Sequence, residues 1–166
     1  GSFIGVISLL RGAGCETVRA SSAVVARTLS DEKFLELLNE DQRIADICRK
    51  QLWDAELAAL LQSISNRSPK QCNFSRSLLS EFKSTAQVII AVDSPTTQSA
   101  FEQDQKLFLA SRPVDESFGQ LGDEIAQINE IHDFPKDIHG FPLRLIALSD
   151  EVLETFQPHR SPDVVD

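Results

Sequence analysis

The sequence has no apolar run long enough to cross a lipid bilayer. Its purely apolar stretches, such as Val88–Val92, fall far short of the roughly 18 residues that a membrane-spanning helix requires. The first residues also lack the basic, then apolar, then small-residue pattern of a secretion leader. We therefore expect neither a membrane span nor a secretion signal within these 166 residues.

Cysteine is scarce as well. Cys15, Cys48 and Cys72 are an odd number, and no two of them form a CxxC pair. This usage fits neither a disulfide-stapled secreted domain nor a structural zinc site. We expect the three thiols to be small buried hydrophobic side chains in a reducing, cytoplasmic compartment.

Basic side chains are too few for a nucleic-acid-binding protein. Sixteen Lys and Arg residues stand against 25 Asp and Glu residues, which gives a net charge of -9 and a pI near 4.8. Affinity for nucleic acid comes chiefly from clustered basic side chains that displace counterions from the phosphates. Nucleic acid is therefore excluded as an expected partner.

The residues that are present predict an α+β chain with one domain or two small ones. Four of the seven glycines lie among residues 1–14, between short apolar runs, which is typical of tight turns that join strands. Thr17–Ser21 and Val24–Leu29 are predicted to be strands. A helix should then begin after Ser30, which can cap it, because Asp31 and Glu32 suit the positive end of a helix dipole.

A second helix is predicted from Glu40 to about Ile64. Its apolar residues recur at helical spacing and predict one long docking face, made of Ile44, Ile47, Cys48, Leu52, Leu57, Leu60, Leu61 and Ile64. Its polar residues are expected largely off that face, namely Arg43, Arg49, Lys50 and Glu56. Trp53 is expected to pack in the core or at an interface.

A break in this pattern predicts a linker at residues 65–73, so residues 1–64 and 74–156 are expected to be separate units. Residues 1–64 carry seven basic and nine acidic groups, for -2, and residues 65–166 carry nine and 16, for -7. The second unit is predicted to be a small mixed α/β connector, and residues 157–166 a loose tail. Its predicted elements are a helix at Phe74–Phe82 and strands at Ala86–Val92, Lys106–Ala110 and Leu143–Leu148.

The stretch GSFIGVISLLRGAGCETVRAS resembles the phosphate-binding cassette of cyclic-nucleotide-binding domains. That cassette runs roughly F-G-E-[small apolar]-[AS]-L-L, a short loop, then P-R-x-A-[TS]-V. In the family a strand, a turn and two helices follow it, as ASSAVVARTLSDEKFLELL and DQRIADICRKQLWDAELAALL do here. The resemblance covers about residues 1–64 and implies a partial β-roll with two C-terminal helices.

In such a cassette, backbone N–H groups at the start of a short helix hold the cyclic phosphate, an arginine neutralises it and a glutamate accepts from the ribose. Here Val6 stands at the glutamate position, Gly14 at the arginine position and Glu16 where the family has alanine. The resemblance thus implies a degenerate pocket, with Arg11 and Arg19 as the nearest substitute cations. Its candidate residues are Gly5, Val6, Ser8, Leu9, Gly14, Cys15, Glu16 and Thr17.

A second resemblance concerns the order of segments along the chain. The cassette, then QLWDAELAALLQSI and the later stretch FPLRLIAL, is similar to the N-terminal cytoplasmic region of bacterial type I secretion ABC exporters. The family places several strands before the cassette, so we expect this chain to belong to a longer polypeptide. The resemblance implies a non-catalytic regulatory or interaction module at the inner face of the plasma membrane, whose partners are the other exporter domains.

Self-association through the helix at residues 40–64 is the other partner we expect, because that helix has a long apolar face. The leading alternative function is a cyclic-nucleotide sensor with a rearranged pocket. A transcription regulator of the catabolite-activator type is a second alternative, although the acidic, proline-broken sequence after the long helix lacks a basic helix-turn-helix.

Other chemistry has little support in the sequence. Either Cys48 or Cys72 could be paired with a histidine, but no nucleophile motif surrounds them. GQLG, residues 119–122, lacks the Lys and Ser/Thr of a phosphate-binding loop and predicts a turn. Four residues could be considered as metal ligands, namely His132, Asp133, Asp137 and His139. They lie in a predicted loop, where solvated polar side chains are the ordinary expectation.

Overall fold

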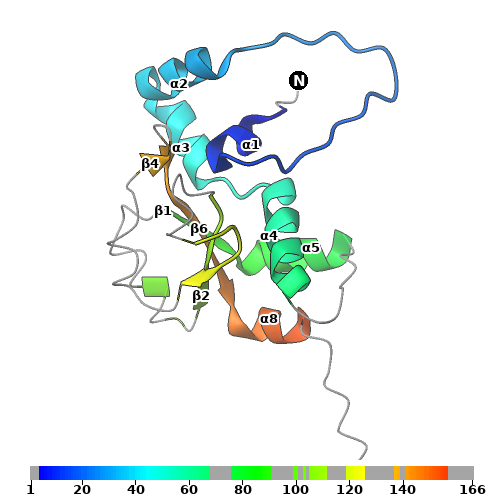
Figure 1. The fold of residues 1–166 in the computed structure, drawn as a ribbon, viewed down its shortest axis with the longest axis vertical. Helices are drawn as coiled ribbons and strands as arrows, with labels where there is room; N and C mark the ends of the chain where they lie inside the picture. The colour runs from blue at the N-terminus through cyan, green and yellow to red at the C-terminus, as the bar shows by residue number, and fades with distance from the viewer. Residues whose placement is uncertain are drawn as a thin grey trace, which may run out of the picture.

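The computed structural model describes residues 4–67, 76–90, 99–100, 103, 105–111, 119–125, 137–138 and 141–156. The chain is a mixed α/β protein (Figure 1), in agreement with the predicted class at that level. The helices are α1 (Val6–Arg11), α2 (Asp31–Glu40), α3 (Gln42–Lys50), α4 (Asp54–Arg67), α5 (Arg76–Thr85) and α8 (Asp150–Phe156). The strands are β1 (Gln87–Ile90), β2 (Gln105–Leu109), β3 (Glu124–Ile125), β4 (Asp137–Ile138), β5 (Phe141–Pro142) and β6 (Arg144–Ser149).

An antiparallel sheet of four strands, in the order β1-β6-β2-β3, forms the centre of the structure. Its register sets Ile146 of β6 opposite Val88 of β1 and Phe108 of β2. The three longer strands fall where apolar, β-branched runs predicted them, at residues 86–92, 106–110 and 143–148. Within the described residues those strand predictions are confirmed.

Alternate residues of β2 and β6 point to opposite sides of the sheet. Residues on both sides are buried, so both faces of the sheet are covered. One face packs against helices α4, α5 and α8 in a single cluster that contains Leu52, Leu57, Leu60, Leu61, Phe82, Phe108, Ala110, Ile146, Leu148, Val152 and Leu153. The other face forms a second cluster of Ile89, Ala100, Leu107, Leu109, Ile125, Leu143, Leu145 and Ala147. Residues from both sides of the predicted linker at residues 65–73 therefore share one core.

A third cluster lies at the other end of the molecule, where α1, α2 and α3 meet. Its buried members are Ile7, Leu10, Leu38, Ala45 and Cys48. Trp53 packs against this cluster, as predicted.

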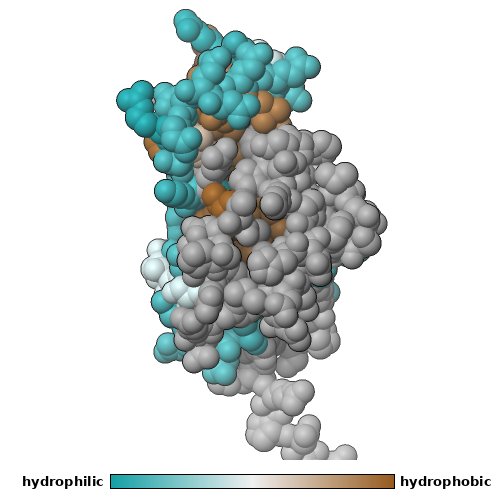
Figure 2. All heavy atoms as spheres, turned by 90° about the vertical axis from the view of Figure 1, so that its left-hand side faces the viewer, coloured by the Kyte–Doolittle hydropathy of each residue, from teal (hydrophilic) through white to brown (hydrophobic). Residues whose placement is uncertain are grey.

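In Figure 2 hydrophilic atoms cover most of the upper part of the molecule, with hydrophobic atoms visible between them. No helix in the described part of the chain is both long and apolar enough to span a membrane.

The predicted continuous helix from Glu40 to Ile64 is wrong. The chain forms two helices, α3 and α4, because residues 51–53 leave the helical conformation. The C-cap residue Gln51 is extended, with φ -73° and ψ 128°. Its carbonyl accepts a hydrogen bond from the Arg144 side chain rather than from a following helical turn (3.0 Å). A contact with a residue 93 positions away thus accompanies the break, and helical spacing alone does not reveal it.

The two strands predicted at Thr17–Ser21 and Val24–Leu29 are also absent. Residues 17–30 are exposed and have no strand assignment. A strand forms only when a neighbouring strand accepts and donates its backbone hydrogen bonds, and no described strand lies beside this segment. Both strand predictions are therefore wrong, because β-branched residues favour a strand only where a partner strand is present.

Local capping signals were more reliable. The Ser30 side chain accepts a hydrogen bond from the Lys33 backbone N–H, and Asp31 and Glu32 occupy the first turn of α2, as predicted. The helix predicted at residues 74–82 corresponds to α5, which continues to Thr85; residues 74 and 75 lie outside the described residues. The sequence GQLG forms the predicted turn, in which the Asp123 N–H donates to the Gln120 carbonyl, and the Gly122 N–H joins it to β2 by donating to the Leu109 carbonyl.

A second cap gives a prediction about acid sensitivity. The Asp41 carboxylate, at the start of α3, accepts a hydrogen bond from the Arg43 side chain and others from the backbone N–H groups of Arg43 and Ile44. These contacts hold the pKa of Asp41 below its ordinary value, with the Arg43 side chain having the largest effect. The stabilisation is complete above the unfolded-state pKa and is lost as the pH falls through the lowered native pKa.

We therefore expect Asp41→Asn to flatten the acid limb of the free energy of unfolding, as measured by urea denaturation at a series of acidic pH values. Asp46→Asn is the matched control, because it removes a carboxylate of the same helix that accepts a hydrogen bond from the Gln42 side chain (2.9 Å), and it leaves the cap in place. An Asp41→Asn profile that coincides with the wild-type profile would contradict the role assigned to this cap.

Candidate functional site

The cassette segment folds into a short helix with a glycine at each end. Gly5 is the N-cap of α1 and Gly12 its C-cap, with φ values of 85° and 65°. Both are in the left-handed region, which residues with a Cβ rarely enter. The Gly12 N–H donates to the Leu9 carbonyl, and the following Ala13 N–H donates to the Ser8 carbonyl. These bonds end α1 and turn the chain back along it.

This turn brings two pairs of the candidate residues together. The Ser8 hydroxyl lies 3.6 Å from the Cys15 sulfur and accepts a hydrogen bond from the Cys15 backbone N–H (3.3 Å). The Glu16 carboxylate accepts a hydrogen bond from the backbone N–H of Gly5 (3.2 Å). The chain's own carboxylate therefore takes a backbone donor at the start of the short helix.

The other candidate residues play simpler parts. Val6 and Leu9 are half-buried and pack against the cluster formed by α1, α2 and α3. Gly14 and Thr17 are exposed, and no described side chain bonds to either of them. The candidate residues thus form one compact loop-and-helix segment with Glu16 folded onto its beginning.

Arg11 points into the protein. It ends α1, is only 2% exposed, and its Nε donates to the Ala110 carbonyl at the end of β2 (2.8 Å). Its Nη1 is buried without a hydrogen-bond partner, and no carboxylate in the described part of the chain lies within ion-pair distance. Arg19 is exposed in the extended segment. Neither arginine is held beside the N-terminus of α1, where a substitute phosphate ligand would need to be.

Arg144, the first residue of β6, is a buried residue whose guanidinium is hydrogen-bonded at Nε, Nη1 and Nη2. Its guanidinium makes a two-bond contact with the Glu56 carboxylate, with Nε–Oε1 and Nη2–Oε2 distances of 2.8 and 2.9 Å. Glu56 is 0% exposed and Arg144 2%. Such paired, charge-assisted hydrogen bonds are among the strongest in proteins. The prediction that Glu56 lies off the buried face is therefore wrong, because Arg144 pairs with it inside.

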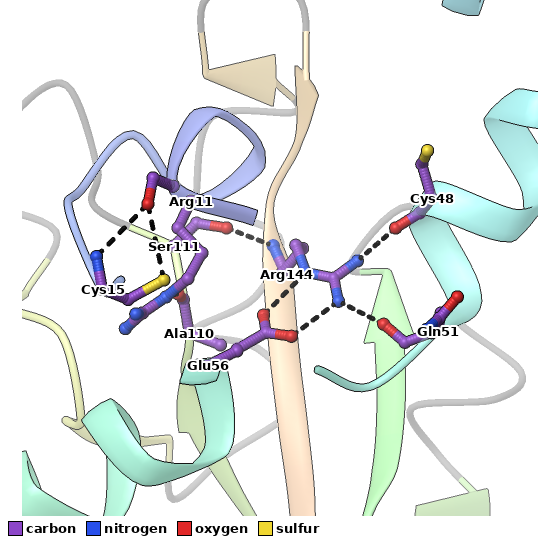
Figure 3. Close-up of polar contacts among 9 residues, drawn as sticks. Arg11, Cys15, Cys48, Gln51, Glu56, Ala110, Ser111 and Arg144 are labelled. Carbon is purple, nitrogen blue, oxygen red and sulfur yellow. Dashed lines mark hydrogen bonds and ion pairs between the residues drawn. The ribbon is translucent and has the colours of Figure 1, made fainter. Parts of the chain in front are cut away.

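The same guanidinium also holds the end of α3. It donates to the carbonyls of Cys48 (3.3 Å) and Gln51 (3.0 Å), which lie where the helix leaves carbonyl groups without intrahelical partners. Figure 3 shows Arg144 between these carbonyls and Glu56, with Arg11 beside Ala110. Arg144 therefore joins the sheet, α3 and α4 at one point.

Cys48 belongs to this junction but is not activated by it. Burial raises the pKa of its thiol, and the nearby Arg144 charge lowers it by less. A thiol with a raised pKa stays protonated near neutral pH, and the thiolate is the nucleophilic form. Cys48 is a buried free thiol, as expected, whereas the free thiol of Cys15 is only half-buried; Cys72 lies outside the described residues.

The described residues contain no group of three or more His, Cys, Asp or Glu side chains placed to hold a metal ion. Of the four candidate metal ligands, Asp137 is in β4, and His132, Asp133 and His139 lie outside the described residues. The linker prediction is wrong at residues 65–67, which belong to α4, with Ser65 buried. The rest of the predicted linker and the whole of the predicted tail lie outside the described residues.

The chain matches no family model, no curated protein and no solved structure. Its function is therefore inferred from the geometry of its own residues, together with the resemblance of the cassette sequence.

Proposed function

We propose that this chain is a non-catalytic regulatory or interaction module whose cassette no longer holds a nucleotide. The observation that carries the proposal is the hydrogen bond from the Gly5 N–H to the Glu16 carboxylate. A phosphate seated at that point would meet a carboxylate of like charge in place of an arginine, and like charges at close range repel. The Glu16 carboxylate thus accepts the hydrogen bond that an anionic ligand would otherwise accept from the Gly5 N–H.

The burial of Arg11 supports the same proposal. The cation nearest to the cassette in sequence is used inside, where it joins α1 to the end of β2 through the Ala110 carbonyl. Releasing it toward a ligand would break that bond and leave the Ala110 carbonyl without the Arg11 donor. The segment is thus built to attach α1 to the sheet rather than to hold a ligand.

The resemblance to type I secretion exporters supports a more specific proposal. In it, the module belongs to a larger bacterial exporter at the inner face of the plasma membrane and acts by contact with the other exporter domains. The chain then contributes shape and surface, not chemistry.

A thermal titration with cAMP and cGMP tests this proposal, with AMP as the matched control ligand. A ligand at 100 times its dissociation constant adds about 2.7 kcal/mol to the free energy of unfolding, which would raise Tm by several degrees. We expect no nucleotide-dependent change in Tm. A saturable rise with a cyclic nucleotide, and none with AMP, would contradict the proposal and favour a sensor.

A further inference from the structure

The segment that joins α1 to α2 is extended and exposed. Residues 17–29 form a wide arc away from the helices (Figure 1), and each of them is exposed. No backbone hydrogen bond involves them in the part of the chain that the structure describes. Thirteen consecutive residues therefore offer their backbone donors and acceptors to solvent or to a partner.

The side chains of this segment are unusual for a solvated loop. Four of the large hydrophobic side chains that the described surface exposes belong to it, and Val25 is 99% exposed. The four are Val18, Val24, Val25 and Leu29. Valine and threonine are among the residues that favour strands, because their branched side chains pack on a pleated surface. These residues are typical of a β-strand, although the segment pairs with no described strand.

Both ends of the segment are fixed. Glu16 is bonded to Gly5 at one end, and Ser30 caps α2 at the other. Binding therefore costs less conformational entropy than it would for a free tail, because the ends are already placed. An extended chain of this kind can bind by adding a strand to the edge of a sheet.

The charge of the segment indicates which kind of protein surface it can bind. It carries Arg19 and Arg27, and no acidic residue lies between Glu16 and Asp31. The remainder of the chain has 14 basic and 25 acidic side chains, for -11. Two such segments facing each other would bring like charges together, whereas the body of a second copy is complementary to them.

The same chain also supplies a sheet edge. Strand β1 lies at the end of the strand order β1-β6-β2-β3, so one of its hydrogen-bonding sides pairs with no described strand. Its sequence, QVII, is β-branched like that of the segment. Reciprocal addition of one segment to each β1 would give a closed two-fold pair, which is the commonest form of assembly.

We propose that segment 17–29 of one copy docks as an added strand on the edge strand β1 of a second copy. This surface replaces the predicted one on the helix at residues 40–64, since most of that apolar face packs inside the chain. The inference gives a partner to the interaction role proposed above, and it stands or falls on association rather than on nucleotide binding.

Light scattering on the intact chain, at micromolar concentration in low and high salt, tests the proposal. We expect a mass of twice 18.4 kDa at low salt and a shift toward monomer at high salt, because salt screens the charge attraction. Val25→Asp should weaken the dimer at least about tenfold in dissociation constant, with little effect on the fold at so exposed a position.

Ile47→Asp is the matched control, because Ile47 is 60% exposed on α3 and lies outside the segment. It should leave the dimer unchanged. Hydrogen exchange gives an independent readout, in which amides of residues 17–29 and 87–90 become protected as the dimer forms. A monomeric wild-type chain would overturn the proposal. A dimer that survives Val25→Asp, or one that Ile47→Asp disrupts equally, would also overturn it.

Discussion

Replacing Arg144 by methionine is expected to lower the free energy of unfolding by about 3–5 kcal/mol, because Glu56 would remain as an unpaired charge in the interior. Glu56 is fully buried, and both of its carboxylate oxygens are bonded to the Arg144 guanidinium. The substitution would also release the Cys48 and Gln51 carbonyls at the end of α3. We expect α3 to loosen from the sheet before α4 and α5 do.

A second substitution separates the charge effect from the loss of packing. In an Arg144→Met, Glu56→Leu variant no unpaired charge is left, so a substantial part of the lost stability should return. Arg11→Met is the matched control, because Arg11 is equally buried but makes one hydrogen bond, to Ala110. It should cost only about 1 kcal/mol. Urea denaturation of the four proteins measures these differences, and equal costs for the two arginines would contradict the account.

Phe82→Ala is expected to destabilise the protein by about 3–5 kcal/mol, which is typical of a large aromatic side chain removed from a packed core. Phe82 is 0% exposed on α5 and belongs to the cluster between the sheet and helices α4 and α8. The loss would open a cavity at the centre of that cluster. The backbone carbonyl of Phe82, which accepts from the Ala86 N–H, is unaffected by the change.

Phe82→Leu is the control for this prediction, because it keeps an apolar side chain at the same place. It should cost clearly less than Phe82→Ala in the same urea denaturation experiment. An alanine variant that loses less than about 1 kcal/mol would mean that α5 does not pack as described, since a fully buried aromatic ring cannot be removed so cheaply.

The parts of the fold that the sequence predicts correctly are those with local causes. The Ser30 cap and the acidic first turn of α2 lie within a few residues of each other, and the apolar runs of β1, β2 and β6 are continuous in sequence. For such elements the preference of neighbouring residues decides the conformation. The prediction of a mixed α/β chain follows from them.

The parts that could not be predicted depend on contacts between distant residues. Glu56 and Arg144 are 88 positions apart, and their pairing buries a carboxylate that helical spacing assigns to the surface. One signal was available, because Arg144 stands inside the apolar stretch FPLRLIAL, where a charge needs a buried partner. The identity of that partner was not readable from spacing.

In the candidate site, too, the local features agree with the sequence prediction and those that depend on distant contacts do not. The resemblance placed Ser8, Cys15 and Glu16 in one cassette, and the structure brings Cys15 onto Ser8 of α1 and Glu16 onto the N-cap Gly5. It also gave Arg11 as a replacement phosphate ligand, whereas Arg11 turns inward to Ala110. Sequence gave no sign of that direction, because it depends on how α1 docks against the end of β2.

The measurement that tests the central claim most directly is a nitrogen–proton correlation spectrum of the labelled chain with and without cAMP. The amide of Gly5, which Glu16 holds, and the amides of Gly12 and Gly14 report on the cassette residue by residue. The account predicts that these signals do not move at saturating nucleotide. Movement of the Gly5 and Gly14 signals together, at a concentration that leaves the sheet signals unchanged, would show a nucleotide in the cassette and would contradict the account.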